Sequence, residues 1–113
     1  MAACAVSLAF LSDFYTRCVV PEEERSGALL TTQEVVESII KSATLASKCN
    51  FVALVPAAVA PPTAFASHAF CNPFSLLVSA LEEHFMNAVA TDVYIWVDIF
   101  AINQHDPGAA IAL

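Results

Sequence analysis

The chain has 113 residues, and its four lysines and arginines against eleven aspartates and glutamates give a net charge of −7 at pH 7. This length predicts one small domain whose core buries about two thirds of the surface of the unfolded chain. Because no two basic residues are adjacent, the sequence offers no cationic patch for phosphate groups. Nucleic acid and anionic membrane surfaces are therefore not expected as partners.

The composition is apolar, with 58% hydrophobic residues and a mean hydropathy of +0.69. No charged residue occurs between Lys48 and Glu82. This stretch contains four prolines: Pro56, Pro61, Pro62 and Pro73. They divide it into pieces that are shorter than the about 20 apolar residues that a membrane helix needs. We therefore expect a buried core and no membrane span.

The apolar residues 1–11 lack the basic start of a secretory signal, so we expect a cytoplasmic location, with secretion as the minor alternative. The cysteines are far apart, with no Cys-x-x-Cys pair and no histidine at a spacing typical of zinc sites: Cys4, Cys18, Cys49 and Cys71. We expect thiols in a reducing compartment rather than two disulfides, and no metal site.

The N-terminal third predicts two helices separated by a linker. Residues 1–20 favour a helix that ends before Pro21, and the acidic run that follows predicts a solvated linker over 21–30. Thr31 and Glu34 have the spacing of a capping box, which predicts a helix from there to about Ser47 at the start of the main unit, 31–113.

The second half predicts a strand, a helix and a strand. Residues 51–55 favour a short strand, with a helical extension as the alternative, and 57–62 form a connector. A buried strand is expected at 63–67. Asn72 and Pro73 then predict a helix start, with Asn72 as the N-cap, and the apolar stripe extends to about Ala88. The run 93–99 has the composition of a strand covered on both faces.

This order predicts an α/β fold containing a βαβ unit at about 63–99, with parallel strands and a right-handed crossover. Additional helices precede the unit. Because few strands are available, we also expect an open sheet edge near 93–100. The isolated chain is then expected either to self-associate through that edge and the exposed helix stripes or to be marginally folded.

Polar residues follow both strands of this unit. Ser67 and His68 end the first strand, and Asp98 lies at the end of the second. The loop after the second strand contains four more polar residues: Asn103, Gln104, His105 and Asp106. Ligands of parallel sheets bind beyond the carboxyl ends of the strands, so these side chains are candidates for one site. Asp98 is either a structural carboxylate that accepts backbone N–H groups or a ligand-binding group, and His68 has the same two interpretations.

A Ser-His-Asp triad of Ser67, His68 and Asp98 is not expected. Consecutive strand residues point to opposite faces, so the serine and the histidine would not meet as nucleophile and base. The sequence also lacks a Gly-x-Ser-x-Gly turn.

The segment from Trp96 to Gln104, W-V-D-I-F-A-I-N-Q, resembles the W-I-D-x-x-C-I-N-Q block of fungal heterokaryon-incompatibility domains, which are similar to Toll/interleukin receptor (TIR) domains. A closer resemblance is to uncharacterised TIR-like proteins with S-H-x-W, N-P-F and V-D-I-F-A-x-N-Q-H segments, over about residues 31–106. Phe70 and Ala101 depart from the family residues Trp and Cys.

The resemblance implies a partial flavodoxin-like parallel sheet used in defence or death signalling, either by self-association or, in some members, by cleavage of NAD. The glutamate that cleaves NAD lies in those members on a helix after the next strand, which the resemblance places past Leu113. No catalytic residue is therefore transferred, and Glu82 and Glu83 are not candidates. We expect a signalling and self-association module without a cofactor or activity of its own, whose partner is another protein or a second copy of the chain. The alternative is part of an NAD-cleaving enzyme, with NAD as substrate.

Overall fold

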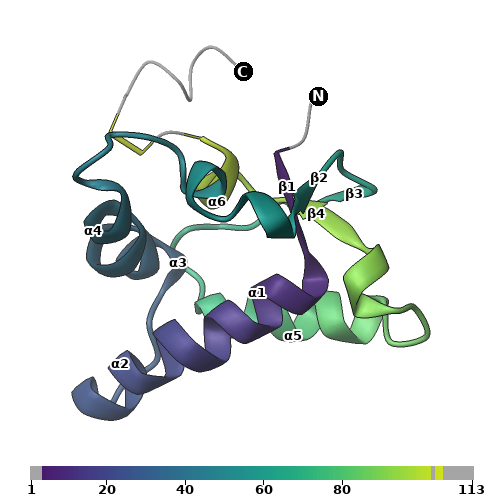
Figure 1. Ribbon diagram of the computed structural model, residues 1–113. Helices are drawn as coiled ribbons and strands as arrows, with labels where there is room; N and C mark the ends of the chain where they lie inside the picture. The colour runs from purple at the N-terminus through teal and green to yellow at the C-terminus, as the bar shows by residue number, and fades with distance from the viewer. Residues whose placement is uncertain (1–3, 103, 106–113) are drawn as a thin grey trace.

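The computed structural model describes residues 4–102 and 104–105, which form a mixed α/β domain (Figure 1). Its sheet has the order β2-β1-β4-β3, and the strands are β1 (Ala5–Ser7), β2 (Val59–Ala60), β3 (Ala64–Phe65) and β4 (Tyr94–Trp96). β1 is antiparallel to β2 and β4, whereas β3 is parallel to β4. The α/β class is therefore confirmed, but the sheet is mixed rather than parallel throughout.

The predicted unit of strand, helix and parallel strand is present. Ala64 pairs with Ile95, and α5 (Phe74–His84) lies between β3 and β4 in the chain. The helix begins one residue later than expected. Pro73, not Asn72, is its N-cap, and the Pro73 carbonyl accepts a hydrogen bond from Leu76 N at 3.1 Å. The helix also ends four residues earlier than the predicted Ala88.

Both strands of this unit are shorter than predicted. Phe65 of β3 is 63% exposed, so the prediction of a buried strand at 63–67 was wrong. β4 buries Ile95 and leaves Tyr94 and Trp96 half-buried, so it is fully covered on one face only. The run 93–99 does not continue as a strand, because Asp98 begins α6 (Asp98–Ala101).

The N-terminus differs most from its prediction. Residues 5–7 are a strand rather than the start of a helix, and α1 (Leu8–Phe14) begins directly after it. The Ser7 side chain caps this helix by accepting a hydrogen bond from Phe10 N at 3.0 Å. Tertiary pairing of β1 between two other strands overrides the helical preference of these apolar residues.

The helix also continues past Pro21, so the prediction of a linker from residue 21 was wrong. A π-helical segment, Tyr15–Val19, connects α1 to α2 (Val20–Ser26). Proline inside an α-helix lacks an N–H and clashes with the carbonyl four residues earlier. The wider π turn directly before Pro21 changes the backbone where that clash would occur. Gly27, in the left-handed region at φ 75°, ends the helix.

The capping box is confirmed. Thr31 Oγ1 accepts from Glu34 N at 3.2 Å, while Glu34 Oε1 accepts from Thr31 N at 2.9 Å. The helix that follows consists of α3 (Thr32–Val35), a π-helical segment (Val36–Ile40) and α4 (Lys41–Thr44). It ends three residues before the predicted Ser47.

The predicted strand at 51–55 was wrong. Phe51–Leu54 is a 3-10 helix, which agrees better with the helical alternative, and the Asn50 side chain accepts a hydrogen bond from Ala53 N at 3.3 Å. A further 3-10 turn, Pro56–Ala58, leads into β2 where only a connector was expected. A last 3-10 turn, Ala90–Asp92, precedes β4.

A cluster of phenylalanines joins the helices to α6. Phe14 and Phe100 meet edge to face with ring centroids 5.1 Å apart, and Phe51 approaches Phe100 at 5.3 Å. Phe74 of α5 packs edge to face on Phe14 at 5.9 Å. Phe100 is fully buried, so the packing of its ring, rather than a long helical contact surface, holds the short helix α6 in place.

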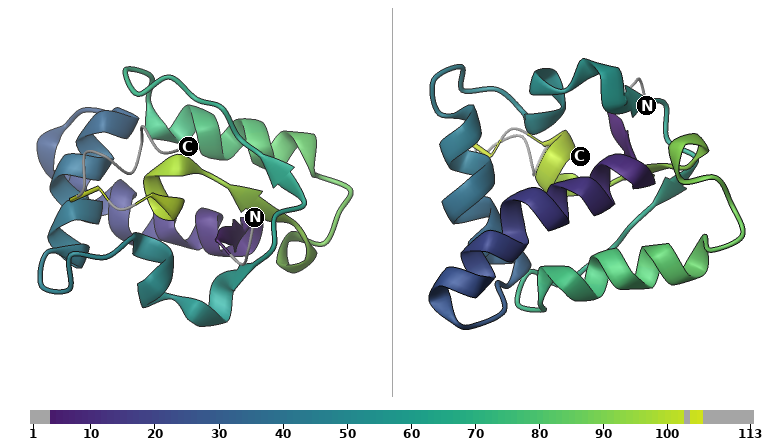
Figure 2. Two further views of the ribbon diagram at one scale, coloured as in Figure 1. Left: turned by 90° about the horizontal axis from the view of Figure 1, so that it is seen from above. Right: turned by 60° about the horizontal axis from the view of Figure 1, so that its bottom comes forward.

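The helix α1 runs beside α5 along one side of the molecule, α2 continues from α1 past the start of α5, and α3 and α4 lie at one end (Figures 1 and 2). The Ser12 hydroxyl of α1 donates to Glu82 Oε2 of α5 at 2.7 Å. β4 lies inside the sheet, between β1 and β3, so the prediction of an open edge near 93–100 was wrong. The outer strands are β2 and β3.

Candidate functional site

The structure brings His68 and Asp98 together at the carboxyl ends of the two parallel strands. His68 follows β3 and Asp98 follows β4, and the two side chains interact electrostatically. The loop after β3 is held in place by Gln33 N, which donates to Phe70 O at 3.0 Å. The parallel pairing therefore places these two predicted residues at one rim, as expected for this topology.

Partial burial raises the pKa of the Asp98 carboxyl above its usual range. Hydrogen bonds from the backbone N–H groups of Ile99 and of Asp98 itself, and the positive charge of a protonated His68, act in the opposite direction. Burial has the larger effect, so the carboxylate is destabilised relative to an exposed aspartate. Its backbone hydrogen bonds agree with the structural interpretation of this residue.

The imidazole of His68 has one nitrogen in an unusual environment. Its Nε2 is shielded from solvent and has no hydrogen-bond partner among the residues that the structure describes.

Ser67 does not complete a triad. It is exposed and takes part in none of the hydrogen bonds between described residues. His68 and Asp98 therefore lie at one rim without the adjacent hydroxyl nucleophile that acyl transfer requires.

Trp96 lies on the half-buried face of β4 beside the edge strand. Its ring centroid is 6.1 Å from that of the exposed Phe65 on β3. The two rings form an aromatic pair at the edge of the sheet, close in sequence to both His68 and Asp98.

The side chain of Gln104 contacts the end of α6. Its Nε2 lies within hydrogen-bond distance of three carbonyl oxygens at the end of α6, at 3.2 Å from Ile102, 3.4 Å from Asp98 and 3.5 Å from Ile99. The last carbonyls of a helix have no partner within it, so this amide caps α6. Asn103 and Asp106, also predicted to lie near the site, are outside the described residues.

His105 ties the end of the described chain to α4. Its Nε2 lies 2.7 Å from Thr44 Oγ1, and the same hydroxyl donates to Ile40 O at 2.8 Å. A hydroxyl has only one proton to donate, so Thr44 accepts from His105 and the Nε2 atom of His105 carries hydrogen. Because Thr44 is almost fully buried, this contact fixes the segment after α6.

Two polar side chains with similar roles were missed in the sequence. Asn50 Nδ2 donates to Ala101 O at 3.1 Å, which adds a second tie to α6. Glu23, interpreted as part of a solvated linker, is buried and accepts from Leu30 N at 2.9 Å. The glycine four residues after Glu23 was the available signal, since glycine commonly follows the end of a helix.

The described residues contain no group of three or more His, Cys, Asp and Glu side chains arranged to hold a metal ion. Over residues 4–102 and 104–105, no helix has both the length and the apolar character needed to cross a membrane. Comparison with family models, with curated proteins and with solved structures finds no match. The fold and the site therefore define a small mixed α/β domain with a polar rim.

Proposed function

We propose that this chain is a cytoplasmic self-associating signalling module, similar in role to TIR-like domains, and that it associates through the β3 edge of its sheet. The finer assignment to a flavodoxin-like fold belongs to the same proposal. The parallel β3–β4 pair with α5 between its strands supports that assignment, whereas the antiparallel β1 differs from it.

The observation that carries the proposal is the exposed aromatic residue on the outer strand. β3 is the last strand of the sheet, and Phe65 on it is 63% exposed beside Trp96. An uncharged edge strand is a template for pairing with another chain. No charge between Lys48 and Glu82 opposes such pairing, which makes a second copy of this chain a suitable partner.

Sedimentation velocity over a broad concentration series tests the proposal. We expect the weight-average mass of the wild-type chain to rise with concentration and the variant Phe65→Lys to stay monomeric, because a charge on the edge opposes pairing. Leu54→Lys is the matched control, since Leu54 is 42% exposed on the 3-10 helix, away from the edge. A wild-type monomer throughout, or equal effects of both variants, would contradict it.

The second candidate is a contribution to a nucleotide-processing site that cleaves NAD. The specific observation in its favour is the His68–Asp98 pair, in which a shielded imidazole nitrogen lies near a carboxyl of raised pKa. Release of nicotinamide from NAD by the purified chain, lost in His68→Ala, would favour this candidate over a purely associative role.

A further inference from the structure

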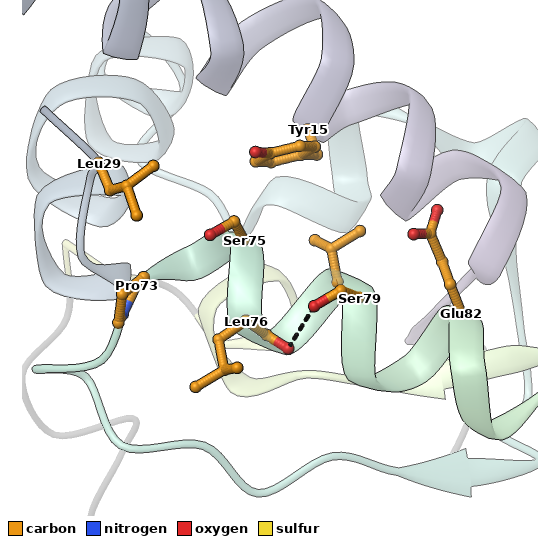
Figure 3. Close-up of a pocket in the computed structure, with 8 residues that line it drawn as sticks. Tyr15, Leu29, Pro73, Ser75, Leu76, Ser79 and Glu82 are labelled. Atoms are coloured by element: carbon orange, nitrogen blue, oxygen red, sulfur yellow. Dashed lines mark hydrogen bonds between the residues drawn. The ribbon is translucent and has the colours of Figure 1, made fainter. Parts of the chain in front are cut away.

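Three neighbouring hollows that share lining residues lie along α1, α2 and α5. The central hollow, of about 350 Å³, extends from Leu29 to Glu82 with Tyr15 above it (Figure 3). A second hollow of about 340 Å³ shares Tyr15 and Leu29 with it, and a third of about 230 Å³ shares Glu82. We call these three the α1–α5 groove. It is separate from the β3 edge and from the polar rim.

Large apolar side chains of this groove are exposed. Leu29 is 59% exposed, Leu76 is 53% exposed and Met86 is 73% exposed, and they lie in the lining of the hollows. Leu29 and Leu76 line the central hollow, whereas Met86 lines the third. Such grooves accept the apolar face of an amphipathic helix, whose anchors recur at i, i+3 or i+4 and i+7.

The charge of the groove restricts its occupant. Three carboxylates line it, from Glu23, Glu24 and Glu82, whereas no Lys, Arg or His is among the lining residues of the three hollows. Burial and the neighbouring Glu23 also raise the pKa of the Tyr15 hydroxyl, as expected beside negative charge. An anionic ligand would be repelled, and a cationic one attracted.

A second copy of this chain does not supply the complementary charge. It has a net charge of −7, and three of its four basic residues form ion pairs within their own helix: Arg17 with Asp13 at 3.0 Å, Arg25 with Glu22 at 2.6 Å and Lys41 with Glu37 at 3.2 Å. The occupant therefore belongs to a different protein.

We propose that the α1–α5 groove binds an amphipathic helix of a partner protein, with apolar side chains against Leu29, Leu76 and Met86 and with lysine or arginine beside Glu24 and Glu82. Apolar burial supplies affinity, and the carboxylates select for basic flanks and set the orientation of the helix.

A fluorescently labelled peptide of leucine and lysine, amphipathic as a helix and about 18 residues long, is the probe. Its matched partner has glutamate in place of every lysine. Fluorescence anisotropy with the full chain is expected to show binding of the lysine peptide only. The affinity should fall as salt rises, because the screening length shortens from about 10 Å at 0.1 M to about 3 Å at 1 M ionic strength.

The double variant Leu76→Ala/Glu82→Gln is expected to weaken binding of the lysine peptide about tenfold, the sum of one lost apolar anchor and one lost charge. The control Leu45→Ala/Asp92→Asn removes the same two groups from exposed positions outside the groove, and should leave the affinity unchanged. Thermal melts of both variants verify folding, and amide chemical shifts of Leu29 and Leu76 should move on binding.

Three results would overturn the proposal. Equal binding of the glutamate peptide would remove the role of charge. Equal weakening by the control variant would show that the peptide responds to net charge alone. Loss of self-association in Leu76→Ala/Glu82→Gln, without loss of peptide binding, would assign the groove to a second copy.

Discussion

Replacing Asp98 separates the cost of its partly buried charge from the benefit of its hydrogen bonds. Its carboxylate accepts from the backbone N–H groups of Asp98 and Ile99, and burial raises its pKa. Asp98→Ala removes both acceptors, each worth about 0.5–1.5 kcal/mol net, and it also relieves the desolvated charge. The expected loss in the free energy of unfolding is about 1–2 kcal/mol, less than the about 2–4 kcal/mol expected for a fully buried carboxylate.

Asp98→Asn keeps an acceptor oxygen and removes the charge. At pH 7 we expect it to be as stable as the wild type or more stable. A carboxyl whose pKa is raised on folding binds protons more tightly in the folded state, so its contribution to stability falls as pH rises from the unfolded pKa through the folded pKa. The advantage of Asp98→Asn over the wild type should therefore grow upward from about pH 4, the ordinary aspartate pKa.

Urea unfolding followed by far-ultraviolet circular dichroism measures both effects. For a domain of this size the dependence on urea is about 1 kcal/mol per M, so Asp98→Ala should lower the midpoint by about 1–2 M. Trp96 fluorescence is a second probe, and coincident transitions would confirm two-state unfolding. If Asp98→Asn is as unstable as Asp98→Ala at pH 7, or if its difference from wild type does not change with pH, the reasoning from desolvation is wrong.

Two further variants test contacts that the sequence did not indicate. Thr44→Val keeps the shape of the side chain but leaves the His105 N–H without its acceptor, so we expect a loss of about 1–2 kcal/mol by urea unfolding, whereas Thr44→Ser should lose less. Glu23→Ala removes the acceptor of Leu30 N, and we expect a loss of about 1–3 kcal/mol with faster hydrogen exchange at that amide. Unchanged exchange at Leu30 would show that the amide is protected by other contacts.

Local signals predicted several elements correctly. The capping box at Thr31 and Glu34 involves groups three residues apart, so the sequence contains the whole interaction. The helix α5 was predicted from the helical periodicity of its apolar residues. The strand β4 was predicted from a run of β-branched and aromatic residues. Both signals are also local. Their order along the chain was enough to predict that β3 and β4 are parallel.

The candidate site was predicted in part for the same reason. Parallel pairing brings the ends of β3 and β4 to one edge, so His68 and Asp98 were expected to lie near each other. The roles of Gln104 and His105 were not predictable, because each depends on a partner that only the fold brings close: the end of α6 for Gln104, and Thr44, 61 residues away in the chain, for His105.

The sequence by itself determined the class of the domain, its capped helix and the parallel strand pair, because caps and periodicity act over a few residues. Tertiary structure decided that residues 5–7 are a strand, because only pairing with β2 and β4 satisfies that backbone in the sheet. It also decided that the helix passes through Pro21 and that Glu23 is buried. For residues 5–7 the free energy of long-range strand pairing exceeds the weak local helical preference, and no local pattern records that pairing.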